Sequence, residues 1–249
     1  MTAATSVAGA ARPVTGSNRV AAVLRMNLVD VRDRFGGAWV ILAAIFAVNL
    51  VIWWAIRVNV DDAGAGTTGA VSAVFFIVGS TYLIAMTQVM PFALSLGITR
   101  RHFYTGVCLL LAIETLAHAV LLTALLGIER ATGGWGVGMD FFSMTFMPVQ
   151  NPLLQVLTYW GPLLTIGLVF VAMGAVFRRW GQYGIWAVGL VVLAVLGAVV
   201  VGFTLQNAWP AFGRFFVDTP VPLLMAGYPL VIAVIATVGG YLVVRRARV

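Results

Sequence analysis

The sequence predicts an all-α integral membrane protein with six transmembrane helices, an amphipathic helix at the membrane surface before the first of them, and both termini in the cytoplasm. Two observations carry this prediction: six long apolar stretches alternate with short polar connections, and the arginines are concentrated on one side of that alternation. Composition agrees, since 61% of the residues are hydrophobic and only 9% are charged, a balance far from that of soluble domains.

Each apolar stretch is long enough to cross a bilayer. A helix rises about 1.5 Å per residue, so about 20 residues cross the hydrocarbon core of about 30 Å. The six predicted spans are residues 37–56, 71–90, 103–128, 153–177, 184–205 and 222–244. They form a transmembrane domain over residues 37–249, and their even number places both termini on the same side.

The arginines indicate which side faces the cytoplasm. All 15 basic residues are arginine, and only Arg57, Arg130 and Arg214 fall outside the N-terminal segment, the second and fourth connections and the C-terminus. Because arginine and lysine are enriched in cytoplasmic loops, both termini are predicted in the cytoplasm. The formal net charge of +7 is therefore an orientation signal, and it does not indicate a nucleic-acid partner.

The N-terminal region divides into two parts. Residues 1–18 are small and polar and are predicted to be disordered. In residues 19–36 apolar side chains recur every three or four positions, which predicts a basic amphipathic helix in the cytoplasmic interface. Gly36 and Gly37 are expected to bend the chain into the membrane. The alternative is a helix that packs on a cytoplasmic partner.

Three connections carry more apolar residues than water-exposed loops need. The link 91–102 (PFALSLGITRRH) has a helix stop at Gly97 and a helix N-cap at Thr99, and its apolar surface predicts a protein contact. The links 129–151 and 206–221 are rich in Trp and Phe, which favours short helices in the outer membrane interface. A re-entrant functional segment is the alternative for these two links.

Lysine is absent from the chain. A nucleotide-binding P-loop needs its lysine on the phosphates, so this chain cannot house one. If the protein is driven by ATP, the motor is another polypeptide.

The layout and the stretch ALSLGITRRHFYTG, Ala93 to Gly106, resemble the ABC-2 type permease, the membrane subunit of bacterial type V ABC exporters. The resemblance covers the whole chain in topology, and this elbow is its one specific local match. Two features that would extend the likeness are absent from this sequence: a fused ATPase and a long extracellular domain that would indicate a cargo.

The resemblance implies a half-transporter that exports a hydrophobic or amphipathic substrate across the bacterial cytoplasmic membrane. Two copies, or this chain and a paralogue, would surround a central pathway, and each would sit on a separate ABC ATPase subunit that binds ATP and magnesium. The elbow would couple to that ATPase. Its contact residues, carried over to this sequence, are Leu94, Leu96, Ile98, Thr99, Arg100, Arg101, His102 and Phe103.

Four polar residues within the predicted spans are candidates for a functional or structural role. Glu114 falls near the middle of the third span, and His118 follows four residues later on the same helical face. Ionisable groups at that depth face protein or water, so the pair is either a proton relay or substrate contact, or a hydrogen-bonded pair that ties the bundle together. Asn49 and Gln88 are candidate bonds between helices. The Gly161–Pro162 pair is expected to kink the fourth span, and Pro229 the sixth.

Enzymatic functions fit poorly. Two histidines and one cysteine cannot supply a His/Cys metal cluster, and no G-x-S-x-G nucleophile motif is present. We therefore expect no catalytic residue, no metal and no cofactor in this chain. Besides the exporter subunit, two functions stay open: a proton-coupled carrier or channel using Glu114 and His118, and a membrane scaffold without transport.

Overall fold

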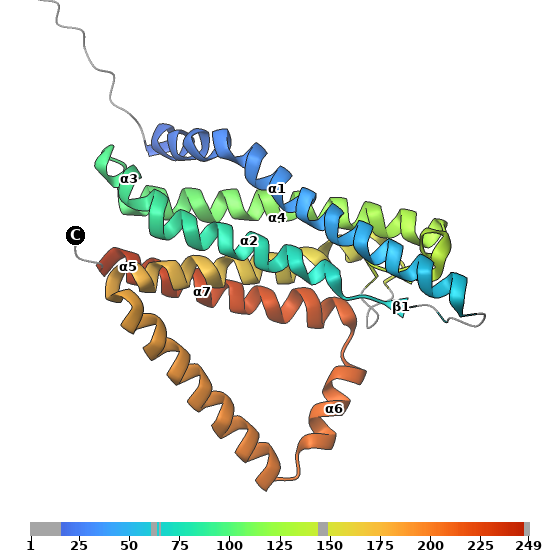
Figure 1. The fold of residues 1–249 in the computed structure, drawn as a ribbon. Coiled ribbons are helices and arrows are strands. Elements are labelled where there is room, and N and C mark those ends of the chain that lie inside the picture. Colours follow the sequence, from blue (N-terminus) through green and yellow to red (C-terminus); the bar gives the residue numbers. More distant parts are fainter. Residues whose placement is uncertain (1–15, 61–63, 65, 144–148, 247–249) are drawn as a thin grey trace, which may run out of the picture.

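The computed structural model describes residues 16–60, 64, 66–143 and 149–246, with side chains from residue 35 onward. The chain is an all-α protein (Figure 1). Its helices are α1 (Gly16–Asn59), α2 (Ala73–Ile84), α3 (Met90–Ser95), α4 (Arg100–Ala131), α5 (Pro152–Leu205), α6 (Trp209–Asp218) and α7 (Tyr228–Arg246). Single π turns, Ala85–Val89 and Leu223–Gly227, join α2 to α3 and precede α7.

Within the described residues, five helices are long and apolar enough to cross a membrane. They cover Phe35–Asn59, Ala70–Ser95, Arg100–Ala131, Pro152–Leu205 and Leu223–Arg246. The sequence predicts six spans, and the count differs because the predicted spans 153–177 and 184–205 lie in one 54-residue helix, α5.

Helix α5 changes direction at Gly181, whose φ of 66° and ψ of −155° are not helical. Glycine adopts these angles readily, whereas a side chain would be strained there. Residues 182–205 leave the other helices at this point, and α6 leads back toward α7 (Figure 1). We call residues 182–218 the arm; from residue 186 to 201 every residue of the arm is exposed.

At the predicted kink, Gly161–Pro162, α5 keeps helical backbone angles and does not break. Gly161 instead allows close packing, since a Cβ atom on it would lie 2.4 Å from the carbonyl oxygen of Met225. The Oγ1 atom of Thr165 lies 2.7 Å from the carbonyl oxygens of both Gly161 and Pro229. A kink was also predicted at Pro229. The structure has a π turn there, Leu223–Gly227, which ends two residues before this proline.

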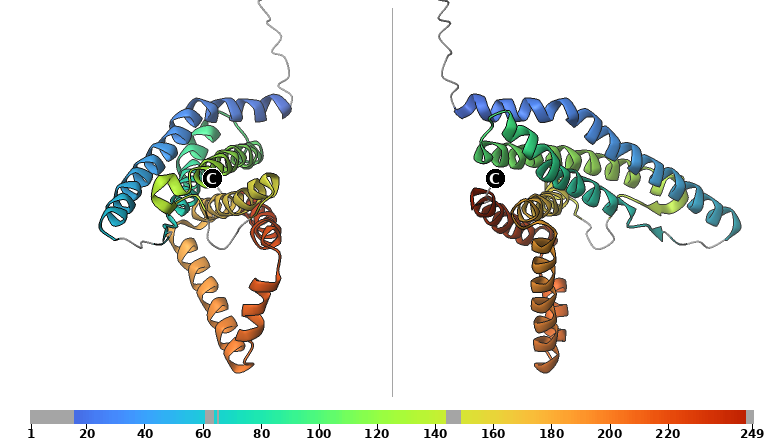
Figure 2. Two further views of the ribbon diagram at one scale, coloured as in Figure 1. Left: turned by 90° about the vertical axis from the view of Figure 1, so that its right-hand side faces the viewer. Right: turned by 60° about the vertical axis from the view of Figure 1, so that its left-hand side comes forward.

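Helices α1, α2, α4, α7 and residues 152–180 of α5 form the bundle. The first part of α5 packs against α7, α4 and α2, whereas α1 packs mainly on α4. Seen along the bundle in Figure 2, α1 lies on one side and the arm projects from another. The buried core lies between these helices and includes the fully covered rings of Tyr82, Phe103, Tyr104 and Tyr159.

The fold gathers six arginines at one end of the bundle, where α4 begins, α5 breaks and α7 ends. We call this the arginine end. Its arginines are Arg100, Arg101, Arg178, Arg179, Arg245 and Arg246. This grouping is the three-dimensional counterpart of the one-sided arginine distribution in the sequence.

Helix α1 runs without interruption from Gly16 through the predicted bend at Gly36 and Gly37, and its ribbon curves without breaking (Figure 1). It begins inside the N-terminal segment predicted to be disordered, of which residues 1–15 lie outside the described residues. The predicted surface helix 19–36 is therefore the first part of one helix with the span, and its place at a membrane surface stays a prediction.

The two aromatic links differ. The short helix predicted in link 206–221 is confirmed as α6. In link 129–151, by contrast, Phe141 and Phe142 are buried in the core and do not face a membrane interface. Two short parallel strands, β1 (Gly66–Thr67) and β2 (Met139–Asp140), hold this second link against the segment that follows α1. Phe146 lies outside the described residues.

Candidate functional site

From here on, the name elbow covers residues 91–103, which include the two residues before Ala93. These residues form a turn at the arginine end. Pro91 cannot donate a backbone hydrogen bond and its ring clashes with the preceding helical turn, and the π turn Ala85–Val89 lies just before it. Helix α3 then ends near Gly97, whose φ of 82° favours glycine. The side chain of Thr99 accepts a hydrogen bond from the backbone N–H of His102, which confirms Thr99 as the N-cap of α4.

The side chains of the elbow divide into two groups. Leu96 is 60% exposed. Phe92 is exposed to the same extent, and it is not among the contact residues that the resemblance implies. Leu94 and Ile98 are half-buried and pack on the core, and Phe103 is fully buried. A partner protein can therefore reach Phe92 and Leu96. It cannot reach Phe103, which the resemblance had placed among the contact residues.

The polar residues of the elbow also differ in accessibility. The hydroxyl of Thr99 pairs with Nδ1 of His102, so both side chains are engaged in the start of α4. Arg100 is half-buried and makes interactions within the chain. Arg101 is exposed at the arginine end, and it is the basic residue of the elbow that a partner can reach most easily.

A second constellation lies midway along the bundle. The hydroxyl of Tyr82 on α2 donates to Glu114 Oε2 on α4 at 2.6 Å, and all three side chains of the group Tyr82, Glu114 and His118 are buried. The Nε2 atom of His118 is 3.8 Å from Glu114 Oε1, which is too long for a hydrogen bond. The predicted pair is thus present, and Tyr82 is a third member that the sequence did not single out.

Aromatic rings of α1 cover this polar group. The ring of Phe35 stacks on the imidazole of His118 at 4.4 Å between centroids, and the ring of Trp39 follows at 5.8 Å. Among the described atoms, both ring nitrogens of His118 and Nε1 of Trp39 are buried without a hydrogen-bond partner. The group can take up or release a proton only if water or a ligand reaches it between α1 and α4.

The other two polar residues of the predicted spans do not join helices. Nδ2 of Asn49 donates to the carbonyl oxygen of Ile45 in its own helix at 2.8 Å. Gln88 is exposed, and no hydrogen bond joins it to another helix among the described residues. Within the described residues of this single chain, neither side chain makes the predicted bond to another helix.

Glu129 is a further polar residue that the sequence analysis did not single out. It is buried near the C-terminal end of α4, and its carboxylate accepts hydrogen bonds of 2.8 to 3.0 Å from Nε1 of Trp135 and from the backbone of Phe141, Phe142 and Ser143. We call this arrangement the outer clamp. A carboxylate at a helix C-terminus is unfavourable. Because Glu129 lies at such an end, just before the glycine-rich run 133–138, the sequence contained a signal that its carboxylate has a structural partner nearby.

The outer clamp concentrates negative charge. Asp140 lies in β2, and partial burial, together with the nearby charge of Glu129, raises the pKa of its carboxyl above the ordinary value of 3.8. The nearby arginines bind backbone oxygens: Arg57 donates to the carbonyl of Val137 and Arg130 to that of Val149. These contacts close the end of the bundle opposite the arginine end.

The described residues contain no group of three or more His, Cys, Asp or Glu side chains that could hold a metal ion. No known protein family, curated protein or solved structure matches this chain.

Proposed function

We propose that the chain is the membrane subunit of an ATP-driven exporter of the ABC-2 type, in the cytoplasmic membrane of a bacterium, for a hydrophobic or amphipathic substrate. ATP and magnesium bind a separate ABC ATPase subunit, which docks on the elbow. The elbow is the observation that carries this proposal.

The surface of the elbow suits a protein partner. Phe92 and Leu96 are both 60% exposed at the end of the bundle that carries the arginines, where apolar side chains would otherwise meet water or lipid head groups. Buried residues on both sides, Ala93 and Phe103, fix the turn to the bundle. Large apolar groups exposed on such a turn favour a protein contact.

Six crossings are compatible with the length of α5. At about 1.5 Å per residue, its 54 residues extend about 80 Å, more than twice the hydrocarbon thickness of about 30 Å. We propose that α5 crosses the membrane twice, turning back at Gly181. Both termini and the elbow then lie in the cytoplasm, as the positive-inside rule requires.

Single cysteines in a Cys108→Ser background test this topology. We expect a membrane-impermeant thiol reagent applied outside intact cells to label exposed Gly64→Cys and Gln206→Cys, but not exposed Ser95→Cys or Gln182→Cys. Labelling of Gln182→Cys from outside, or of Gln206→Cys only after the cells are opened, would show that residues 182–205 do not cross.

A second copy or a paralogue is proposed to cover the arm. Gly189, Gly197 and Gly202 have no atom of the chain within 4 Å of the position a Cβ would take. An apolar groove of about 490 Å³ lies at the base of the arm beside Trp180 and Tyr183. Small residues allow close helix packing in membranes, so these surfaces suit contact with another permease subunit.

Charged substitutions at the elbow test the docking of the ATPase. We expect the Phe92→Glu/Leu96→Glu variant to insert in the membrane but to lose co-purification of an ABC ATPase encoded beside it, and with it substrate-stimulated ATP hydrolysis. The control is Leu153→Glu, at an exposed leucine of the opposite end of the bundle, which should keep both. Normal co-purification and hydrolysis by the elbow variant would exclude the proposed docking.

A proton-coupled carrier is the second candidate, because the Tyr82, Glu114 and His118 group lies at mid-bundle. Glu114→Gln distinguishes the two functions, since the amide keeps the shape and cannot titrate. In sealed vesicles with ATP and the ATPase subunit, we expect this variant to keep most of its transport. Uptake by the unmodified chain with a pH gradient alone, lost in Glu114→Gln, would favour the carrier, and no transport under either condition would favour a scaffold.

A further inference from the structure

A pocket of about 420 Å³ opens between α4 and α7 near the arginine end. Its walls include Arg101, Thr105 and Cys108 from α4 and Val238 and Tyr241 from α7. This volume lies within the range of ligand sites, about 300 to 1,000 Å³. The pocket shares Arg101 with the elbow but includes neither Phe92 nor Leu96, and it is separate from the polar group at mid-bundle.

The inner part of the pocket is apolar, because its polar groups are already bonded within the protein. The hydroxyl of Tyr104 donates to the carbonyl oxygen of Thr237 at 2.9 Å. The hydroxyls of Thr105 and Thr237 donate to backbone carbonyls of their own helices, at 2.9 and 2.7 Å. A hydrocarbon chain fits such a surface, whereas a hydrated polar molecule would lose hydrogen bonds on entering it.

The rim of the pocket is cationic. Arg101 is exposed in the first turn of α4, a turn without any acidic residue. The positive end of a helix dipole makes that position unfavourable for a cation, and an anion close by relieves it. No carboxylate is among the residues that line the pocket.

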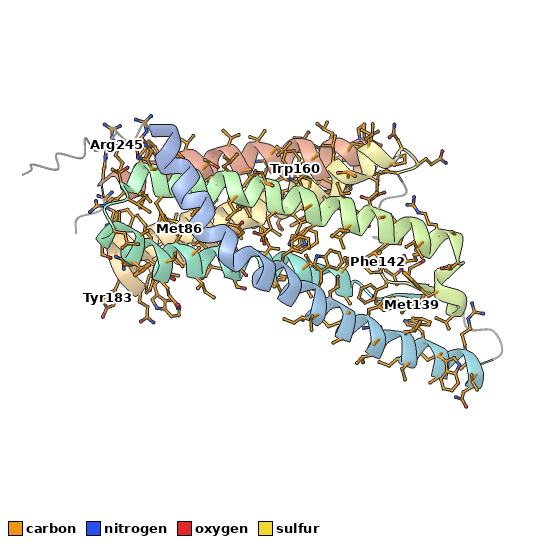
Figure 3. All side chains as sticks on the ribbon, turned by 90° about the horizontal axis from the view of Figure 1, so that it is seen from above. Met86, Met139, Phe142, Trp160, Tyr183 and Arg245 are labelled. Atoms are coloured by element: carbon orange, nitrogen blue, oxygen red, sulfur yellow. The ribbon has the colours of Figure 1, made fainter. Side chains whose placement is uncertain are left out.

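A second arginine extends the rim. Arg245 follows Tyr241 by four residues and Val238 by seven, which places the three on one face of α7. It is exposed at the end of the bundle where α7 ends (Figure 3). Helical side chains generally lean toward the N-terminus of their helix, which from Arg245 is the direction of the pocket.

We propose that this pocket binds one anionic phospholipid from the leaflet at the arginine end. The phosphate group lies between Arg101 and Arg245, and one acyl chain extends along Val238 and Cys108 between the two helices. The cationic rim alone would accept any anion; the apolar interior selects a lipid over a soluble phosphate. Binding requires only that α4 and α7 lie in the bilayer, so it does not depend on the exporter function.

The test is lipid binding to the purified chain, without any ATPase subunit, measured by native mass spectrometry during titration with phosphatidylglycerol or phosphatidylcholine. Each arginine near a membrane surface contributes about fivefold to the affinity for an anionic lipid. We expect Arg101→Gln and Arg245→Gln each to weaken phosphatidylglycerol binding about fivefold and to leave phosphatidylcholine binding unchanged. The control is Arg178→Gln, at an exposed arginine of the same end outside the pocket, which should bind like the unmodified chain.

Two further measurements separate the built pocket from simple surface attraction. Val238 is 53% exposed, so Val238→Trp should fold while filling the space for the acyl chain, and we expect it to weaken phosphatidylglycerol binding about as much as the loss of one arginine. Unchanged binding by Val238→Trp, or equal effects of Arg101→Gln and Arg178→Gln, would overturn the proposal. Displacement of the lipid by millimolar glycerol phosphate would overturn it too, because the site would then bind the soluble anion.

Discussion

The two parts of α5 have similar compositions but differ in burial: residues 152–180 pack in the bundle, and the arm is mostly exposed. Both are apolar and rich in glycine, yet in the first part a Cβ atom on Gly161, Gly167 or Gly174 would come within 2.4 to 2.5 Å of a neighbouring helix. In the arm, Gly189 and Gly197 have nothing within 4 Å. Lipid tails are as apolar as leucine, so apolarity alone does not drive helices together in a membrane. Close backbone approach and polar bonds between helices hold the bundle, whereas residues 186–201 of the arm are all exposed.

The largest expected effect comes from the outer clamp, because it closes the bundle with charge-assisted bonds. Glu129→Gln replaces a carboxylate that accepts four hydrogen bonds by an amide whose N–H groups would face backbone N–H donors. We expect a loss of about 3 kcal/mol in the free energy of unfolding, measured by thermal unfolding in detergent.

The matching change in the arm is Trp209→Phe, which removes an exposed hydrogen bond of 3.2 Å to Thr204. We expect it to cost about 0.5 kcal/mol. Equal losses in the two variants would mean that the clamp and the arm are held alike, which would contradict the comparison.

Glycine substitutions compare the two parts of α5 directly. In Gly161→Ala the new Cβ atom meets the carbonyl oxygen of Met225, and we expect a loss of about 2 kcal/mol from overpacking. In Gly197→Ala the new atom meets open space and the helix propensity improves, so the monomer should unfold at the same temperature or higher. A harmless Gly161→Ala would show that α5 and α7 are free to move apart.

The hydrogen bond at mid-bundle should matter less than the clamp. Tyr82→Phe removes the phenol that donates to Glu114 at 2.6 Å, and we expect it to cost about 1.5 kcal/mol. The control is Tyr183→Phe in the arm, where the side chain is 87% exposed and the expected change is close to zero. Thermal unfolding of the two variants under one condition measures the difference, and no loss in Tyr82→Phe would count against a structural role for this bond.

The smallest effect is a pH dependence at β2. Folding raises the pKa of Asp140 above 3.8, so the folded state favours the protonated form and ionisation of Asp140 destabilises it. Asp140→Asn should therefore raise the unfolding temperature at neutral pH. The gain should shrink as the pH falls through the raised pKa and vanish below about 3.8. A gain that is constant from pH 7 to pH 3.5 would rule out this titration as its cause.

Hydropathy predicted where helices lie in this chain, and the predicted connection between spans 153–177 and 184–205 contains Gly181, where α5 changes direction. The pair Gly161–Pro162 has the stronger local signal for a kink, and yet the break is at Gly181. Beside Pro162, Gly161 packs closely on the carbonyl oxygen of Met225, and the hydroxyl of Thr165 donates to the carbonyl oxygen of Pro229. These contacts join distant parts of the chain, and local propensity does not encode them.

The candidate site shows the same limit. Spacing placed Glu114 and His118 on one face of α4, because a single helix fixes that geometry. Tyr82 could not be found in this way, since its partner lies 32 residues away on another helix. Likewise, the pattern of the elbow gave its cap at Thr99, but only packing decided that Leu96 faces outward while Phe103 is enclosed.

The outer clamp also sets an order of assembly. All of its donors lie within 14 residues of Glu129, so the clamp can close soon after this stretch is synthesised, before α5 is complete. The bond from Tyr104 to Thr237, by contrast, joins residues 133 positions apart. Local contacts form early and distant ones late. We therefore expect the two ends of the bundle to close at different times, the arginine end only when the last helix of the chain is in place.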